Sequence, residues 1–317
     1  MPDFTVAIPT YNGAHRLPEV LDKLRSQINT ENFSWEIIVI DNNSTDNTAK
    51  VVEEYQKNWS ENYLLRYCQE QQQGAGFARQ KAIKEAKSNL IGFLDDDNLP
   101  AENWIAAAYS FSKKYPNAGA FASQIHPIYE IEPPENFRKL APFLAITERG
   151  ENPILYEPSS KLLPPSAGLV IRKEAWLENV PDKLILTGRA NGKMLTSEDL
   201  EVLSHIQQSK WEIWYNPAME IYHKIPHWRL EKTYLLSLIR GIGLSRHVTR
   251  MIGVKPWLKP LVIPAYMAND LRKIIFQILK YGNKVNTDLI AACEMQLYIS
   301  SLVSPFFIWR KLYLESK

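Results

Sequence analysis

The chain has 317 residues and a formal net charge of +2, with 37 Lys and Arg against 35 Asp and Glu. Its hydrophobic fraction of 45% and charged fraction of 23% are those of an ordinary globular protein, which excludes a disordered or fibrous chain. The two cysteines, Cys68 and Cys293, lie far apart, do not suggest a disulfide framework and favour a reducing compartment. The first strand-like run begins at Phe4 with no basic and apolar leader before it, so we expect no secretory signal and a cytoplasmic protein.

Charge is distributed unevenly along the sequence. Residues 228–317 contain 14 Lys and Arg against 5 Asp and Glu, a net of +9, and the residues before them therefore carry a net of −7. A basic tail that also contains aromatic residues predicts an anionic partner. Anionic lipid, a phosphorylated acceptor and nucleic acid are the candidates on charge alone.

Strand-like and helical segments alternate through the first half of the chain. Continuous apolar runs predict strands, and apolar residues at helical spacing predict a helix after each of them. The strands are predicted at 4–9, 35–40, 63–68 and 89–94, and the helices begin near residues 15, 46, 74 and 104. This alternation predicts an α/β fold with a mostly parallel central sheet flanked by helices.

The second half of the chain is less regular. The proline-rich segment 126–165 predicts a functional loop or lid. Strands are predicted at 166–172, 211–215 and 218–223, and helices near 197–208, 229–251, 265–281 and 285–314. Gly253, Pro256, Pro260 and Pro264 are expected to separate the first two helices of the tail, because glycine and proline disfavour a helix interior.

The C-terminal helices carry large apolar and aromatic residues beside Lys and Arg, at 257–267 and 295–309. No window supplies about 20 uninterrupted apolar residues, so no transmembrane helix is predicted. These segments could lie in a membrane interface. Packing on the rest of the chain or on a second subunit is an equally good interpretation.

Polar residues follow four predicted strands at the point where each one ends. Thr10, Asp41, the loop Gly74–Arg79 and the run Asp95–Asp97 all fall at such ends. Ligands bind open α/β sheets beyond the carboxyl ends of the strands, so these residues are expected on one rim. Three adjacent carboxylates repel one another unless a divalent cation binds them. A solvated acidic turn is the other interpretation.

Five segments, in this order along the chain, resemble the family 2 glycosyltransferases of GT-A fold. They are Ala7–Asn12, Val39–Asp46, Gly74–Arg79, Phe93–Asp97 and Ser197–Asp199. The resemblance covers about residues 4–227. The later run His223–Leu230 resembles a subset of bacterial exopolysaccharide transferases that includes those of hormogonium polysaccharide synthesis.

The resemblance also implies how the chain is divided. Residues 1–227 would form the GT-A catalytic domain, with a nucleotide-sugar half at 1–125 and an acceptor half at 126–227. Residues 228–317 would form a basic, helical C-terminal extension.

The family implies a nucleotide-sugar donor, with a UDP-sugar favoured. The residues implied to bind it are Pro9, Thr10, Tyr11, Asp41, Arg79, Asp95 and Asp96. Asp41 would accept a hydrogen bond from the base, Asp96 would contact the ribose, and Asp95 would support them. The local alternatives are a turn-capping role for Asp41 and a surface helix position for Arg79. Arg79 also stands where a G-x-G-x-x-G motif has its third glycine, which weakens a dinucleotide-binding interpretation.

The family further implies a divalent cation, Mn²⁺ or Mg²⁺, held by Asp97 and His223. The cation would neutralise the charge that develops on the departing nucleoside diphosphate. His227 is the alternative to His223, and a structural role remains open for either. Imidazole suits Mn²⁺ better than Mg²⁺.

Asp199 is the implied general base, which would take the proton from an acceptor hydroxyl as it attacks the anomeric carbon. Glu198 would shape the acceptor site. Acids in the first turn of a helix are also favoured by the helix dipole, which is the non-catalytic interpretation of this pair. A base opposite a metal-bound leaving group implies single displacement with inversion and no covalent glycosyl-enzyme.

We therefore predict a metal-dependent, inverting glycosyltransferase that moves a single sugar to a glycan or lipid-linked acceptor in cell-surface polysaccharide synthesis. Processive synthases carry a Gln-x-x-Arg-Trp motif before membrane helices, whereas Gln207–Trp211 lacks the arginine. One alternative is a sugar nucleotidyltransferase, which would need a basic phosphate-binding loop after the first strand. The other is a non-catalytic scaffold subunit that binds a nucleotide sugar. We expect a cytoplasmic protein, with peripheral membrane contact or a homo-oligomer through its tail, and no nucleic-acid partner.

Overall fold

The computed structural model describes residues 1–317 except 60–62, 161, 190–194 and 316–317. The chain divides into two compact units, each assembled from segments that are distant in sequence. The first unit comprises Met1–Ile128, Ala145–Lys183 and His205–Lys224, and the second comprises Tyr129–Leu144, Leu184–Ser204 and Ile225–Lys317. The domain boundaries expected from the sequence, near residues 125 and 227, stay a prediction.

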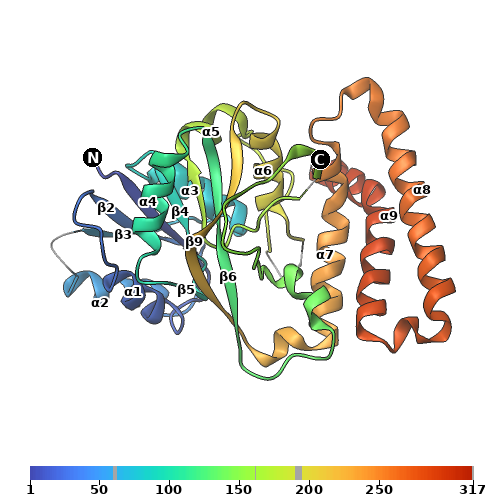
Figure 1. Ribbon diagram of the computed structural model, residues 1–317, viewed down its shortest axis with the longest axis horizontal. Coiled ribbons are helices and arrows are strands. Elements are labelled where there is room, and N and C mark those ends of the chain that lie inside the picture. Colours follow the sequence, from blue (N-terminus) through green and yellow to red (C-terminus); the bar gives the residue numbers. More distant parts are fainter. Residues whose placement is uncertain (60–62, 161, 190–194, 316–317) are drawn as a thin grey trace. The chain divides into compact units, whose positions relative to one another are not determined.

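The first unit is built on a sheet of nine strands among the described residues. They are β1 Phe4–Thr10, β2 Trp35–Asp41, β3 Leu64–Gln69, β4 Leu90–Phe93, β5 Asn98–Pro100, β6 Ala118–Tyr129, β7 Ile154–Leu155, β8 Leu169–Arg172 and β9 Glu212–Ile225. Their order is β3-β2-β1-β4-β8-β6-β9-β5, with β7 paired to β9. Figure 1 shows the blue and cyan strands of the first half of this order together with the helices that follow them in the chain.

Parallel pairing joins β3, β2, β1 and β4 and brings their carboxyl ends to one edge of the sheet. In this register Thr10 lies opposite Asp41, and Phe93 lies opposite Ala7. The pairings of β8 with β4 and β6 and of β9 with β5 and β7 are antiparallel. The sheet is therefore mixed, and parallel over its N-terminal part, where the sequence predicted a mostly parallel one.

The helices of the first unit place their apolar faces against this sheet. They are α1 Leu17–Arg25, α2 Thr48–Lys57, α3 Ala75–Glu85, α4 Trp104–Lys114 and α5 Lys173–Asn179, and α6 Glu198–Gln207 begins in the second unit and ends in the first. Leu17, Val20, Leu21 and Leu24 of α1 are fully buried, as their helical spacing predicted. Trp104 of α4 packs edge-on against Phe4, with ring centroids 6.1 Å apart.

Four strands differ from the sequence prediction: β5, β6 and β7 were not predicted, and β9 is longer than expected. β6 begins at Ala118, in a segment where no strand was predicted, because its small residues have weak strand propensity. β9 is one strand of 14 residues where two were predicted, and it continues through Asn216 and Pro217. The Asn216 side chain accepts a hydrogen bond from the Ala218 backbone at 3.2 Å, so a sequence that looks like a turn is accommodated inside the strand.

The second unit contains three long helices, α7 Lys232–Met251, α8 Lys259–Tyr281 and α9 Leu289–Glu315. The six short 3₁₀ helices of the described chain are η1 Phe137–Lys139, η2 Ala141–Leu144, η3 Pro158–Ser160, η4 His227–Leu230, η5 Pro256–Leu258 and η6 Gly282–Asn286. Figure 1 shows α8 and α9 as an orange and red helical hairpin, and α9 packs against both α7 and α8. Pro260 and Pro264 do not separate helices, because α8 begins at Lys259 and contains both.

Among the described residues, one helix is long and apolar enough to cross a membrane, at Leu289–Leu314 of α9. No such helix was predicted from the sequence, because no window holds about 20 uninterrupted apolar residues. Half of the most apolar stretch of this helix is buried inside the protein. A buried core helix satisfies the same criterion of length and composition, so this criterion alone does not assign a membrane span.

Candidate active site

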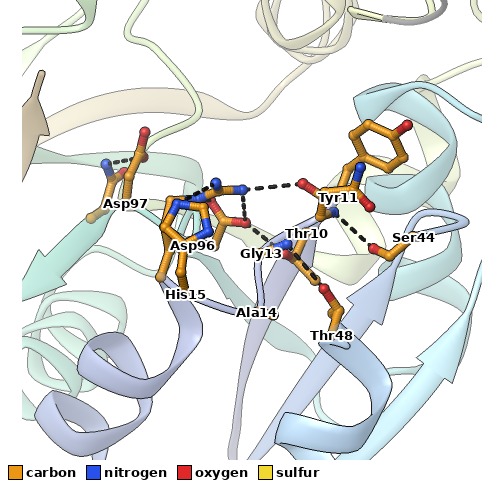
Figure 2. Close-up of polar contacts among 12 residues, drawn as sticks. Thr10, Tyr11, Gly13, Ala14, His15, Ser44, Thr48, Asp96 and Asp97 are labelled. Atoms are coloured by element: carbon orange, nitrogen blue, oxygen red, sulfur yellow. Dashed lines mark hydrogen bonds and ion pairs between the residues drawn. The ribbon is translucent and has the colours of Figure 1, made fainter. Parts of the chain in front are cut away.

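The carboxyl ends of β1, β2 and β4 bring Thr10, Asp41 and the three aspartates to one edge of the sheet. The Asn42 backbone donates a hydrogen bond to the Thr10 carbonyl at 2.8 Å. The Thr10 hydroxyl donates to Asp96 Oδ2 at 2.5 Å. Figure 2 shows Thr10, Gly13 and Asp96 converging at this edge. The grouping of these strand ends that the sequence predicted is present in the structure.

The turns after β1 and β2 hold each other through backbone-to-side-chain hydrogen bonds. Asn12 and Asn43 adopt left-handed backbone angles, with φ of 49° and 62°, which asparagine tolerates better than most residues. Asn12 Oδ1 accepts from the Thr45 backbone at 2.8 Å, and the Asn12 backbone donates to Ser44 Oγ at 2.9 Å. The polar residues after the first two strands are thereby fixed before any ligand binds.

Asp96 is clamped from two sides by β1 and the start of α1. Arg16 Nε lies 2.8 Å from Asp96 Oδ1 and Arg16 Nη2 lies 2.9 Å from Oδ2, a bidentate ion pair. Burial alone would lower the pKa of Arg16, but the hydrogen bonds and charge of Asp96 raise it, so the guanidinium stays charged. A Cβ atom at Gly13 would stand 2.0 Å from Thr10 Oγ1 and 2.6 Å from Asp96 Oδ2, so this position has no room for a side chain.

Asp41 is almost fully buried and accepts two hydrogen bonds. Ser44 donates its backbone N–H to Oδ1 at 2.9 Å, which is the turn-capping contact left open by the sequence. Tyr67 of β3 donates its hydroxyl to Oδ2 at 2.5 Å. Burial, followed by the hydrogen bond and charge of Asp41, raises the pKa of Tyr67, so the phenol stays protonated and donates. Tyr11, by contrast, is 47% exposed at the same rim.

Arg79 is a buried residue of α3 and not the surface helix residue that was its alternative interpretation. Its Nη2 lies 3.1 Å from Asp95 Oδ1. Burial raises the pKa of Asp95, and Arg79 opposes that rise, whereas the neighbouring Asp97 and Asp96 add to it. Asp95 is therefore paired with the Arg79 guanidinium, and the supporting role that the resemblance implied for it stays a prediction.

Asp97 lies beside His223, with Oδ2 and Nε2 separated by 3.6 Å. Antiparallel pairing of β5 with β9 sets Asn98 opposite His223, and that register carries the histidine to the aspartate. His227 lies in the second unit, where its Nδ1 contacts Glu130 Oε2 at 3.0 Å. Of the two histidines left open by the sequence, His223 is the one found at the triplet.

The donor set around Asp97 fits a divalent cation. Among the described residues no three His, Cys, Asp or Glu side chains gather as a complete cage. A carboxylate and an imidazole are nevertheless present, and both are ligand types that Mn²⁺ accepts. Asn98 donates through Nδ2 to Asp97 Oδ1 at 3.0 Å, and its own Oδ1 is buried and accepts no hydrogen bond from the described part of the chain. A buried acceptor left in this state calls for an ion, a water or a ligand group.

Glu198 and Asp199 occupy the first turn of α6, in the second unit. Ser197 before them has a left-handed φ of 76°, which is uncommon for a residue with a side chain. Asp199 Oδ1 accepts from the Leu200 backbone at 2.8 Å, and Glu198 is buried. Glu201, one turn along, accepts from the Ile185 and Leu186 backbones at 2.9 and 2.7 Å and thereby holds the preceding segment.

Sequence reasoning missed Arg16, Tyr67 and Asn98. Arg16 and Asn98 stand next to motifs that were identified, so a search of the motif neighbours for charged and amide residues could have found them. Tyr67 had no local signal, because its contact with Asp41 depends on the parallel register of β2 and β3.

Comparison with solved structures shows the GT-A glycosyltransferase fold. A mannosyltransferase from Pyrobaculum calidifontis, PcManGT, solved with GDP-Man and Mn²⁺, matches with a TM-score of 0.57 and 17% identity, over 96% of this chain and 88% of that one. Residues 1–349 of Staphylococcus aureus TarS, solved with UDP-GlcNAc, match with a TM-score of 0.54 and 17% identity, over 95% of this chain and 91% of that one. At these identities the likeness shows the fold alone.

Residues 5–163, half of the chain, match glycosyl transferase family 2, and the chain therefore belongs to this family of glycosyltransferase enzymes. The Escherichia coli UDP-Glc:alpha-D-GlcNAc-diphosphoundecaprenol beta-1,3-glucosyltransferase WfgD is 33% identical over 108 residues, which are 33% of this chain and 38% of WfgD. The chain spans about half or less of the length of the curated relatives that it matches. The family that the sequence motifs predicted is confirmed.

Proposed function

We propose that this chain transfers a single sugar from a nucleotide-diphosphate sugar to a glycan or lipid-linked acceptor, with inversion and with a divalent cation. The observation that carries the proposal is the arrangement at one sheet edge of buried Asp41, clamped Asp96 and the pair Asp97–His223. This edge is where open α/β sheets bind their ligands. The family membership supplies the reaction class.

The nucleoside would lie against Pro9, Thr10, Tyr11 and Asp41, with Asp96 toward the ribose. Tyr67 holds the Asp41 carboxylate and Arg16 holds the Asp96 carboxylate, so this half of the site is ordered without ligand. A UDP-sugar is the favoured donor, since WfgD by its name uses UDP-Glc and TarS is solved with UDP-GlcNAc. PcManGT is solved with GDP-Man, so the identity of the donor's nucleobase must be determined by a screen of donors.

Asp97 and His223 would hold Mn²⁺ or Mg²⁺, and the orphaned oxygen of Asn98 is available beside them. When bound, the cation supplies positive charge against the diphosphate that departs. Mn²⁺ is favoured, because PcManGT is solved with it and because an imidazole stands in the donor set.

Asp199 would accept the proton of the attacking hydroxyl, and Glu198 would shape the acceptor site. WfgD acts, by its name, on a diphosphoundecaprenol-linked sugar, which supports a lipid-linked acceptor. We place the reaction in cell-surface exopolysaccharide synthesis at the cytoplasmic face of the membrane. The resemblance of His223–Leu230 to hormogonium transferases belongs to the same proposal.

A donor screen tests the proposal. Thermal melting of the full chain is followed with UDP-, GDP- and dTDP-sugars, with and without Mn²⁺, because a ligand that binds the native state raises apparent stability. We expect a UDP-sugar with Mn²⁺ to give the largest rise and to be turned over. Binding without turnover across the panel would indicate the non-catalytic subunit instead.

Two substitutions assign the roles. Asp97→Ala should lower turnover by about 10³-fold, since several kcal/mol of charge stabilisation are lost. Asp199→Asn should leave donor affinity unchanged and lower turnover by about 10²–10⁴-fold. Asp22→Ala, which removes a carboxylate that is 60% exposed on α1, serves as the control and should be neutral. An active Asp97→Ala variant would contradict the assignment of Asp97 as a metal ligand. An active Asp199→Asn variant would contradict the assignment of Asp199 as the general base.

A further inference from the structure

The α8–α9 hairpin of the second unit exposes an unusual number of large apolar side chains. On η5 and α8 they are Trp257, Leu261, Leu271, Ile275, Phe276, Ile278 and Leu279, and on α9 they are Ile299, Val303, Phe306, Phe307, Trp309, Leu312, Tyr313 and Leu314. Five of them are at least 63% exposed: Trp257, Leu261, Leu279, Phe306 and Trp309. Proteins rarely leave so many apolar side chains in water without a partner for them.

These residues form stripes with helical spacing. Leu271, Ile275 and Leu279 follow one another at intervals of four along α8, and Ile299, Val303 and Phe306 follow at four and three along α9. The opposite face of α9 is already used, because Ser300, Ser304 and Ile308 are buried. The exposed stripes are therefore additional to the faces that the fold needs. Figure 1 shows the two helices as a hairpin beside α7.

The charges on this hairpin are asymmetric at its surface. The exposed basic side chains are Lys255, Arg272, Lys280, Lys284 and Arg310. Of the three acids between residues 256 and 314, Asp270 is buried against Arg250 at 2.6 and 2.9 Å, and the half-buried Glu294 accepts from Gln277 at 3.0 Å. Asp288 is exposed and accepts from the Ala291 backbone at 2.8 Å, so five exposed cations stand against one exposed acid. The exposed charge of the hairpin that carries the apolar stripes is consequently net positive.

We propose that the α8–α9 hairpin lies on the surface of a bilayer that contains anionic lipids. An apolar stripe beside lysine and arginine is the pattern of a helix that buries its apolar side chains at the acyl boundary while its cations contact lipid phosphates. Trp257, Trp309 and Tyr313 have the amphipathic rings that favour this depth. The chemistry recognised is an anionic lipid surface, and no particular headgroup is required.

A second copy of the chain fits this surface less well. A two-fold interface sets each patch against itself, so Arg272, Lys280 and Arg310 would face their own copies. An anionic bilayer surface offers acyl chains to the apolar stripes and phosphates to the cations at the same time. A membrane span by α9 is disfavoured, because one face of that helix is packed in the unit and carries Ser300, Ser301 and Ser304.

Vesicle binding tests the proposal without any need for turnover, so its outcome is independent of the proposed function. The full chain is floated with vesicles of phosphatidylcholine alone or mixed with phosphatidylglycerol, at low and high salt. We expect binding to the mixed vesicles, weakened by salt, and little binding to the neutral ones. The failure of the mixed vesicles to carry the protein at low salt would overturn the proposal.

Three variants locate the surface. Phe306→Ser with Trp309→Ser should weaken binding to mixed vesicles by more than about tenfold, since two large apolar side chains no longer enter the lipid. Lys280→Glu with Lys284→Glu should abolish the preference for anionic lipid. Leu177→Ser, which changes a residue that is 62% exposed on α5, is the matched control and should bind like the unaltered chain.

Two further measurements separate the competing occupants. The substituted side chains are exposed, so circular dichroism and thermal melting should show an unaltered fold. A stable dimer by sedimentation that the Phe306 and Trp309 substitutions dissociate, with no vesicle binding, would assign the surface to a second copy and overturn the proposal. Resistance of vesicle-bound protein to extraction by high salt and alkaline carbonate would show a spanning α9 and would also overturn it.

Discussion

At the scale of single residues, the carboxylates of the site are held by side chains from neighbouring elements. Arg16 is the clearest case, because it holds both oxygens of Asp96 from the start of α1. Arg16→Ala should lower the free energy of unfolding by about 1–3 kcal/mol, since Asp96 keeps only Thr10 as a hydrogen-bond donor. UDP affinity should fall by about tenfold, because the carboxylate is no longer oriented. Urea unfolding and titration calorimetry measure the two effects.

Arg16→Lys provides the comparison for that prediction. Lysine keeps the charge but has no planar fork for a bidentate contact, so both losses should be intermediate. Equal UDP affinity in the alanine variant and the unaltered chain would show that Asp96 needs no orientation by Arg16.

Tyr67 has the same relation to Asp41 that Arg16 has to Asp96. Tyr67→Phe removes the hydroxyl that donates to Asp41 Oδ2. The free energy of unfolding should fall by about 1–3 kcal/mol, because a buried carboxylate oxygen loses its hydrogen-bond donor. UDP binding should weaken, because the Asp41 carboxylate that would accept a hydrogen bond from the uracil is no longer held in place. Tyr63→Phe is the matched control, since its hydroxyl donates to the Arg25 carbonyl at 3.1 Å, and it should leave UDP affinity unchanged. Identical affinities for both variants would place Asp41 outside the nucleoside site.

These two partners also mark where prediction from sequence stops. Thr10, Asp41 and Asp95–Asp97 could be identified because each follows an apolar strand and because parallel strands end at a common edge. Arg16 reads as an ordinary residue at a helix start, and its role appears only when β1 and β4 are neighbours. Tyr67 depends on the register between β2 and β3. Strand ends can therefore be predicted from local sequence, whereas side-chain contacts between different strands cannot.

At the scale of elements, helix packing in the second unit depends on a glycine. A Cβ atom on Gly243 of α7 would stand 2.5 Å from Ser300 Cβ and 3.0 Å from the Leu297 carbonyl of α9. Gly243→Ala would gain up to about 1 kcal/mol of helix propensity, but the overlap should cost about 1–3 kcal/mol and prevail. We expect a lower midpoint in urea unfolding.

Ser300→Gly serves as the partner substitution in a double-mutant cycle. It removes the atom that an alanine at Gly243 would strike, so the double variant should be more stable than the sum of the two single effects allows. A stabilising Gly243→Ala variant would mean that α7 and α9 are farther apart than the structure has them.

The elements that the sequence predicted least well share a physical cause. β6 is built on small residues, and β9 contains Asn216 and Pro217, so neither has the apolar alternation of a typical strand. α8 contains Pro260 in its first turn, where a missing N–H breaks no helical hydrogen bond. It also contains Pro264, which lies inside the helix. The helices with strong apolar periodicity, such as α1, were predicted correctly because packing and pattern agree.

At the scale of the whole molecule, motif order predicted the family and the fold, while the division into units that mix distant segments left no trace in the sequence. Segment 184–204 illustrates the difficulty. It belongs to the second unit, although it lies between two segments of the first. Glu201 binds it there through the backbones of Ile185 and Leu186, and Lys311 of α9 donates to the Ile185 carbonyl at 2.5 Å. The Lys311 contact joins residues 126 positions apart and has no local signature in the sequence.

Glu201 gives this arrangement a dependence on pH. Burial raises its pKa above the ordinary glutamate value of 4.5, and the two backbone hydrogen bonds and Lys311 offset only part of that rise. An acid whose pKa is raised by folding contributes stability that is fully present below 4.5 and is lost as the pH rises through the folded value. Glu201→Gln is neutral at every pH, so its free energy of unfolding relative to the unaltered chain should increase between about pH 4 and pH 7. Urea unfolding across this range measures the difference. Parallel pH curves for the two proteins would show that the hydrogen bonds from Ile185 and Leu186 compensate the burial of the charge completely.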